Sequence, residues 1–194
     1  MPRMFGRMTV TVMAGTLLLV APLAASPQLD DAPARFTAAA VDMNRGAAGT
    51  VELVVNRWSS DADRDRLTDV TFSKGAGKLL DALQEMPRMG YIRTPGSIGW
   101  DIRFARHEVA PDGGERIMLV TDRRMSFREL ANHHRSVDYP FTVIELRLQK
   151  NGEGEGNVSV ATRIIADRDS KVVTLENYDI QPVMLTRVTR ERVS

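Results

Sequence analysis

The chain has 194 residues, of which 43% are hydrophobic and 26% are charged, and these proportions are typical of a folded globular protein of one or at most two domains. It contains no cysteine, which excludes disulfides, thiolate metal sites and a cysteine nucleophile. The formal net charge of +1 gives no electrostatic reason to bind nucleic acid, so we expect no nucleic-acid partner.

The first 25 residues have the three parts of a secretory signal peptide. Arg3 and Arg7 form a positive start, residues 8–20 are uncharged, and residues 21–25 are small. The uncharged stretch is shorter than the roughly 20 residues that a membrane-spanning helix needs, so an uncleaved anchor is the weaker alternative. We therefore expect cleavage after Ala25, and an exported chain in the periplasm or outside the cell without an integral membrane span. Residues 26–34 are predicted to form a flexible leader.

A two-residue rhythm dominates the chain after the leader. Apolar and polar residues alternate clearly in 51–56, 100–105 and 144–149, as in half-buried strands whose side chains point to opposite faces. Runs rich in Gly, Pro, Asn and Asp separate the alternating stretches and predict turns. The predicted strands are 35–43, 49–58, 88–94, 98–109, 115–124, 138–150, 157–166, 171–178 and 182–190.

The short links between these strands favour hairpins, because parallel neighbours need a crossover of a dozen or more residues. The fold class expected is mainly β (α+β): a single antiparallel meander sheet, closed or partly closed as a barrel, in one domain of residues 35–194. About 170 residues remain after cleavage of the signal peptide, which is enough chain to bury a core without disulfides. A sandwich is the alternative arrangement of the same strands.

The rhythm changes between Trp58 and Arg88, where a pair of helices is predicted near 60–86. Ser60 and Asp63 have the spacing of a helix N-terminal capping box. The sequence KGAG at 74–77 should break the first helix, and Pro87 should end the second. The pair could pack on one face of the sheet or close the mouth of a barrel.

An acidic motif in the first helix superficially resembles a calcium loop. Asp61, Asp63 and Asp65 have the right spacing, but Arg66 and Phe72 occupy the positions where that loop requires Gly and Glu. Helix capping explains the acids better, and no cofactor or metal is expected.

Two further motifs suggest catalysis or metal binding only weakly. Ser97 lies between glycines, but Pro95 replaces the glycine that a serine nucleophile elbow needs, so a turn is favoured. His133 and His134 are adjacent and point in different directions on any regular element, which is poor geometry for one metal. A site made from one of them with His107 and a carboxylate is the remaining alternative, and no catalytic or metal-binding residue is predicted.

Charged residues are grouped on the expected polar faces of several strands. On an open sheet this group would form a solvated surface of mixed sign, whereas in a barrel closed around it the same residues would line a polar cavity and need partners. The residues are Asp101, Arg103, His107, Glu145, Arg147, Arg163 and Glu176.

Four sequence runs carry a resemblance to other proteins. The runs are GYIRTP at 90–95, SIGWD at 97–101, DYPF at 138–141 and QPVMLT at 181–186. They resemble stretches of an uncharacterised family of exported soil-bacterial proteins that has no assigned function. The resemblance spans most of the chain after the leader and implies export but no particular activity.

The order of elements is similar to that of the intracellular lipid-binding barrels, in which a helix pair caps the ligand cavity. This likeness concerns architecture alone, and an architecture does not establish a function.

The leading functional expectation is an exported non-catalytic binding protein for a small amphipathic or anionic ligand. Trp58, Tyr91 and Trp100 would offer apolar contact, and Arg103 and Arg147 would hold an anionic group, because the planar guanidinium donates two parallel hydrogen bonds. These ligand-binding candidates follow from strand parity. The first alternative is a cell-envelope protein–protein interaction module, and the second is a hydrolase that uses a histidine beside acids.

Overall fold

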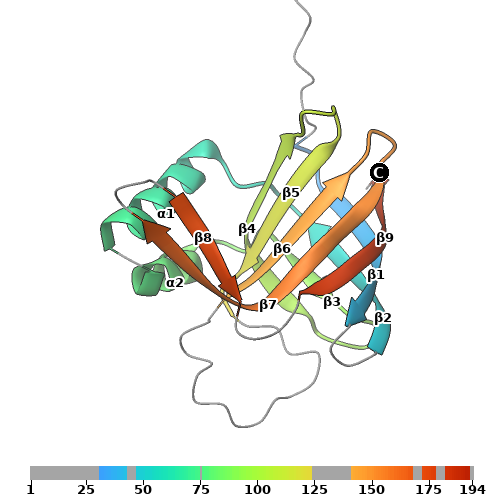
Figure 1. Ribbon diagram of the computed structural model, residues 1–194, viewed down its shortest axis with the longest axis horizontal. Coiled ribbons are helices and arrows are strands. Elements are labelled where there is room, and N and C mark those ends of the chain that lie inside the picture. The colour runs from blue at the N-terminus through green and yellow to red at the C-terminus, as the bar shows by residue number, and fades with distance from the viewer. Residues whose placement is uncertain are drawn as a thin grey trace, which may run out of the picture.

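The computed structural model describes residues 31–42, 47–74, 76–123, 141–167, 172–177 and 182–192. Within them the chain forms an antiparallel closed barrel of eight strands with two helices, which confirms the predicted fold class (Figure 1). The strands are β1 (Ala34–Asp42), β2 (Ala47–Val55), β3 (Gly90–Arg93), β4 (Trp100–Val109), β5 (Glu115–Thr121), β6 (Phe141–Leu148), β7 (Glu153–Asp167), β8 (Val172–Asn177) and β9 (Val183–Arg192). The helices are α1 (Asp61–Lys74) and α2 (Ala76–Glu85).

The barrel follows the chain as a meander and closes through its last strand. Strands β1 to β6 pair in sequence order, β6 pairs with β7, β7 with β9, and β9 returns to β1. All of these pairings are antiparallel. Each strand of the described ring therefore has a neighbouring strand on both sides, although the short β3 covers only part of β2 and of β4.

Strand β8 lies outside this closed ring. Thr162 of β7 pairs with Phe141 of β6 and also with Asn177 of β8, so β8 lies on the edge of β7 opposite β6. That is the edge that β9 occupies further down β7. The two strands therefore follow one another along a single side of β7, and the far half of β7 forms a two-stranded ribbon with β8 beyond the barrel.

Apolar side chains fill the inside of the described barrel. The pairing register places Phe36, Leu53, Ile117, Ile144 and Leu185 on one face of the sheet, and each is fully buried. The other inward positions of β1 are alanines, so small side chains lie beside the large Phe36 ring in the narrow interior. This filling provides the core that a chain without cysteines needs.

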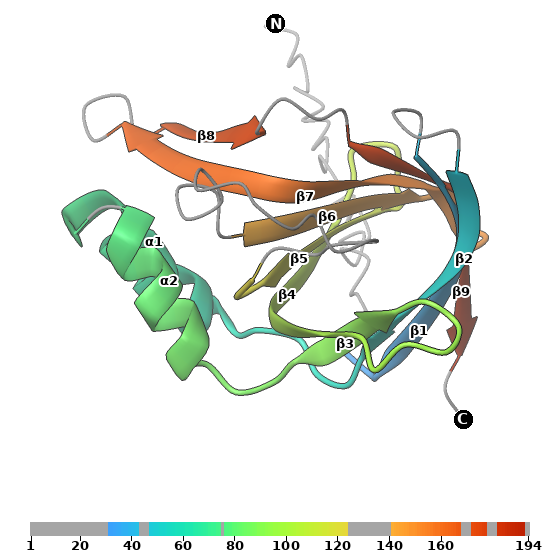
Figure 2. The same cartoon turned by 90° about the horizontal axis from the view of Figure 1, so that it is seen from below.

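The helix pair covers the outside of the wall. Figure 2 shows α1 and α2 beside β4, β5 and β6, with β7 and β8 extending over them. Phe104, Val120, Phe141 and Val143 point to the outer face there, yet they are at most 8% exposed. The burial of these outward residues, together with the contacts of α2 with β4 and of both helices with β7, indicates that the pair packs on the outer face of the sheet. This differs from the helix pair that caps the cavity of a lipid-binding barrel.

The predicted start of the first helix is confirmed in atomic detail. The backbone N–H of Ser60 donates to Asp63 Oδ2 at 2.9 Å, and the Asp63 N–H donates to Ser60 Oγ at 3.2 Å. This reciprocal pair is a capping box in which aspartate takes the place of glutamate. The acidic motif of α1 is thus explained as a cap.

Turn chemistry at the strand ends also follows the sequence. The Ser97 N–H donates to the Thr94 carbonyl at 3.0 Å, and Gly96 has φ = 79°, so this serine lies in a turn. In the 151–156 hairpin only Gly152 has positive φ, whereas Gly154 belongs to β7. A Cβ on Gly154 would lie 1.9 Å from the Arg147 carbonyl oxygen, so close strand approach requires this glycine.

Candidate functional site

A β-bulge in β4 reverses the direction of the side chains that follow it. Ile102 pairs with Thr121, but Phe104 pairs with Val120, so one extra residue is inserted between them. Beyond this bulge, His107 pairs with the inward-facing Ile117. The expected polar face shared by Asp101, Arg103 and His107 is therefore wrong for His107, because regular alternation does not continue through a bulge.

A second bulge has the same effect in β9. The register with β1 shifts between Thr186 and Thr189, and Arg187 adopts φ = 52°, a left-handed conformation that is unusual for a residue other than glycine. After the bulge, Arg190 pairs with the inward-facing Phe36, and its guanidinium carbon lies 5.8 Å from the Phe36 ring centroid. The two bulges thus aim one histidine and one arginine at the same end of the barrel interior.

Glu115 joins these two side chains. His107 Nδ1 lies 2.7 Å from Glu115 Oε1, and Arg190 Nη1 donates to Glu115 Oε2 at 2.6 Å. The side chains of His107, Glu115 and Arg190 are 5%, 11% and 20% exposed. We call these three residues the end cluster.

The ionisation of Glu115 is set by its partners. Burial opposes the charged form, but the hydrogen bond from His107 and the positive charge of Arg190 outweigh it, so the pKa of Glu115 lies below its ordinary value. The carboxylate is thus held ionised between two donors.

Two further residues from outside the sheet contact His107. The Trp58 ring stacks on the His107 ring with 3.8 Å between centroids and an interplanar angle of 4°. His107 Nε2 lies 3.0 Å from Asp31 Oδ1, and the Trp58 indole N–H donates to the Ala32 carbonyl at 3.2 Å. The residues immediately before β1 are therefore fastened to the end cluster.

A chain of charged contacts crosses the outer face of the wall from β1 to β5. Glu52 lies 3.4 Å from Arg35 and 2.5 Å from Arg93. Tyr91 lies between Arg88 and Arg93, whose guanidinium carbons are 5.2 and 5.3 Å from its ring centroid. We call this series the outer ladder.

The outer ladder continues through β4 towards β5. Arg88 lies 3.1 Å from Asp101, and Asp101 lies 3.6 Å from Arg103. Arg103 reaches Asp122 at 3.1 Å and also donates to the Met86 carbonyl at 3.1 Å, which connects the ladder to the end of the helix pair. The ladder as a whole holds four arginines against three acids.

A groove of about 380 Å³ lies beside the outer ladder. Arg93 and Glu52 form its charged side, and hydroxyl groups come from the strand and the turn. The lining residues are Thr50, Glu52, Arg93, Thr94, Pro95, Gly96 and Ser97.

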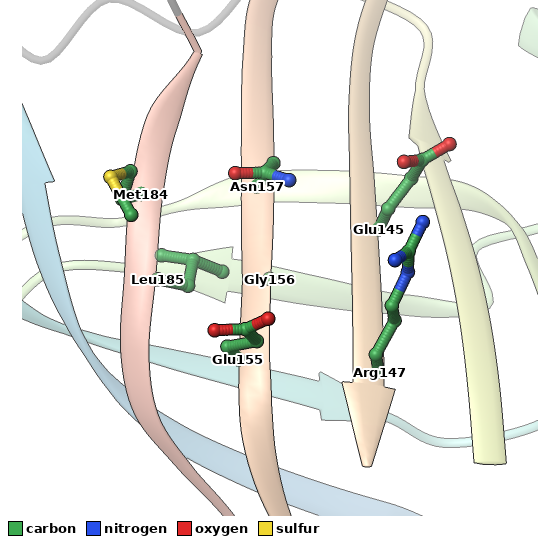
Figure 3. Close-up of a pocket in the computed structure, with 7 residues that line it drawn as sticks. All are labelled: Glu145, Arg147, Glu155, Gly156, Asn157, Met184 and Leu185. Atoms are coloured by element: carbon green, nitrogen blue, oxygen red, sulfur yellow. The ribbon is translucent and has the colours of Figure 1, made fainter. Parts of the chain in front are cut away.

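A smaller groove of about 220 Å³ lies across β6, β7 and β9. Figure 3 shows Glu145 and Arg147 on β6, Glu155 and Asn157 on β7, and Met184 on β9. Cross-strand pairing continues from Met184 through Asn157 and Glu145 to Met118 of β5. Both methionines are exposed, Met118 by 39% and Met184 by 44%.

The five ligand-binding candidates from the sequence lie in separate places. Tyr91 and Arg103 belong to the outer ladder, and Trp58 lies against the end cluster. Trp100 pairs with the inward-facing Ile92 and packs against the core, whereas Arg147 lies in the smaller groove. The structure thus brings together only Tyr91 and Arg103.

Sequence reasoning missed Glu115 and Arg190. Glu115 precedes Ile117 and Leu119 in a regular alternation, so its parity alone marks it as an inward-facing acid. Arg190 carries no such signal, because only the bulge turns it inward. His133, His134, Arg163 and Glu176 cannot be placed in this way: the two histidines lie outside the described residues, and the other two are described only in their backbone.

No protein-family model, curated protein or solved structure matches this chain. In the described ranges, no group of three or more histidine and acidic side chains is arranged to hold a metal ion. Across the same part of the chain, no helix has the length and apolar character to cross a membrane. Function must therefore be inferred from the geometry of the barrel, its outer grooves and the end cluster.

Proposed function

We propose that the chain is an exported, non-catalytic binding protein for a small anionic molecule with an apolar part, held in the groove beside the outer ladder. Because buried apolar side chains fill the barrel interior, we place the ligand on the outer face, where both described grooves lie. The observation that carries it is the position of Arg93, which lines the larger groove and belongs to a ladder with one excess positive charge.

The groove supplies the contacts that such a ligand needs. A guanidinium binds a carboxylate or phosphate through parallel hydrogen bonds, and Thr94 and Ser97 add polar groups. Pro95 offers an apolar contact, and the Tyr91 ring lies next to Arg93. By contrast, the smaller groove has two glutamates and one arginine among its lining residues, which disfavours an anion.

The test is a titration of the ¹⁵N-labelled protein with benzoate, using benzamide as the uncharged control. Benzoate should shift the backbone amide signals of residues 91–97 saturably, and benzamide should not. Arg93→Gln should weaken benzoate binding by about tenfold or more, since hydrogen bonds to charged groups contribute about 1.5–3 kcal/mol.

Arg116→Gln is the matched control, because Arg116 is an exposed arginine that pairs with Glu108 on a different part of the wall. Equal affinity in the Arg93 and Arg116 variants would reject the groove as the binding site. Export is tested separately by the intact mass of the chain from its host, which should lack residues 1–25.

A second candidate function is the envelope interaction module, and the exposed methionines favour it. Met118 and Met184 flank Glu145 and Asn157 in one row across four strands, and flexible methionines are frequent in protein-binding surfaces. Native mass spectrometry of protein from the host distinguishes the two functions: a retained small molecule supports the first, and a stoichiometric protein complex supports the second.

A lysine scan of this surface sharpens that distinction. Met118→Lys with Met184→Lys should dissociate such a complex, whereas Ile98→Lys, at a fully exposed residue of the β3–β4 turn, should not. A complex that survives the double substitution excludes this row as its interface.

A further inference from the structure

Two hydrogen-bond donors at the end cluster converge on one short segment of the chain. His107 Nε2 faces the Asp31 carboxylate at 3.0 Å, and the Trp58 indole N–H donates to the next carbonyl, that of Ala32, at 3.2 Å. The donors belong to stacked rings, so their positions relative to one another are fixed. Together they contact a carboxylate and the peptide carbonyl of the residue that follows it.

Both ring nitrogens of His107 face carboxylate oxygens, those of Glu115 at Nδ1 and of Asp31 at Nε2. An ionised carboxylate accepts hydrogen bonds and does not donate them, so each ring nitrogen that carries a proton has an acceptor in place. The charged groups around this ring are Asp31 from the leader, Glu115 from β5 and, through Glu115, Arg190 from β9.

Asp31 completes the set of partners around His107. Glu115 is shared by Arg190 and His107 Nδ1, and Asp31 is the second carboxylate against the ring. Withdrawal of Asp31 would leave Nε2, on a side chain that is only 5% exposed, without its carboxylate partner, and a buried polar group without a partner is costly. The Asp31 side chain itself is 85% exposed, so water can solvate this carboxylate after it leaves, whereas the His107 ring stays buried.

We propose that His107 and Trp58 form a carboxylate-binding site for an acidic peptide, which the chain's own Asp31 and Ala32 occupy as an internal ligand. An aspartyl residue followed by any residue with a free carbonyl supplies both acceptors. The built-in occupant is covalently attached and thus present at a high effective concentration, so it competes with any external peptide. The site is separate from the groove beside the outer ladder.

The test uses the dipeptide N-acetyl-Asp-Ala-N-methylamide and its asparagine analogue as probes of the full chain. Asp31→Ala vacates the carboxylate position at His107 Nε2, and the aspartyl probe should shift the His107 ring signals saturably, with the Trp58 indole N–H signal following as the probe's carbonyl displaces that of Ala32. The affinity should be at least tenfold higher than in the unsubstituted chain, where Asp31 competes. The asparaginyl probe should bind at least tenfold more weakly because it lacks the charge.

Two variants on the Asp31→Ala background assign the contacts. Adding His107→Gln removes the imidazole ring, and adding Trp58→Phe keeps an aromatic ring for stacking but removes the indole donor. Each added substitution should weaken the binding of the aspartyl probe. If the His107→Gln variant does not fold, the Trp58→Phe variant decides the outcome, and its binding is measured from the His107 ring signals.

Asp65→Ala is the matched control, since it removes an exposed carboxylate on α1 that pairs with Arg64 and should leave probe affinity as in the unsubstituted chain. The proposal is overturned if Asp31→Ala binds the aspartyl probe no better than Asp65→Ala. Equal binding of the aspartyl and asparaginyl probes would overturn it as well.

Discussion

The end cluster and the outer ladder are built from the same kinds of charged side chain, yet they differ in burial. Three of the four ladder arginines, Arg35, Arg88 and Arg93, are 44–50% exposed, although Glu52 and Asp122 are only 19% and 14% exposed, whereas all three members of the end cluster are at most 20% exposed. Water solvates a separated pair on the outer wall, but it cannot do so fully inside the barrel end. Burial rather than the number of ion pairs therefore decides which group the fold depends on.

The two groups also differ in how the chain places them. The ladder uses the regular outward positions of neighbouring strands, such as the cross-strand pair Glu52 and Arg93. The end cluster requires a bulge in each of β4 and β9. Bulges that re-aim side chains are characteristic of sites with a specific role, which agrees with a binding role for the end cluster.

The largest expected effect is the loss of Glu115. Glu115→Ala leaves His107 and Arg190 facing one another inside the barrel without the carboxylate between them. Removal of one partner from a buried charged group costs about 3–5 kcal/mol. Urea denaturation should show this loss as a lower midpoint with an unchanged slope, and a loss below about 1 kcal/mol would contradict the structural importance of the cluster.

A smaller effect is expected from acid. Because the pKa of Glu115 in the folded chain lies below its ordinary value of 4.5, the unfolded chain binds the proton more tightly. The stabilisation from this carboxylate is therefore complete above that ordinary value and is lost as the pH falls through the lower folded pKa. Urea midpoints measured between pH 6 and pH 3 should fall less steeply in Glu115→Gln than in the unsubstituted chain, and parallel curves would contradict this.

The smallest effect is expected on the outer ladder. Glu52→Ala removes the acid shared by Arg35 and Arg93, but both arginines are more than 40% exposed and regain water. Its urea midpoint should fall several-fold less than that of Glu115→Ala. The remaining difference should shrink further in 0.5 M salt, because exposed pairs are screened. A loss equal to that of Glu115→Ala would show that burial does not separate the two groups.

The sequence predicts the strands well because hydrophobic alternation and turn residues are local signals. Predicted strand 115–124 is observed as Glu115–Thr121, and predicted strand 182–190 as Val183–Arg192. The helix pair is predictable for a similarly local reason, the spacing of Ser60 and Asp63. The sequence does not indicate where the pair packs, because that depends on which outward residues are apolar across several strands.

The end cluster was not predicted because bulges are not visible in the alternation that they interrupt. In β4 the run from Trp100 to Phe104 alternates regularly in sequence, yet Phe104 points outward under the helices and His107 inward. In β9 the inserted residue is Arg187, a residue type that does not favour positive φ and so gives no signal. The alternation therefore assigns His107 to the wrong face and gives no sign that Arg190 points inward.

Pairing of β9 with β1 has a consequence for the order in which the molecule is assembled. Ala34 pairs with Arg192, so the first of the described strands to leave the ribosome cannot complete the ring until the last of them has been made. Contacts so distant along the chain form slowly and late. A ring that closes only with its last described strand leaves the chain open while that strand is still missing. Passage through a translocation channel, the route that we predict from residues 1–25, requires such an open chain.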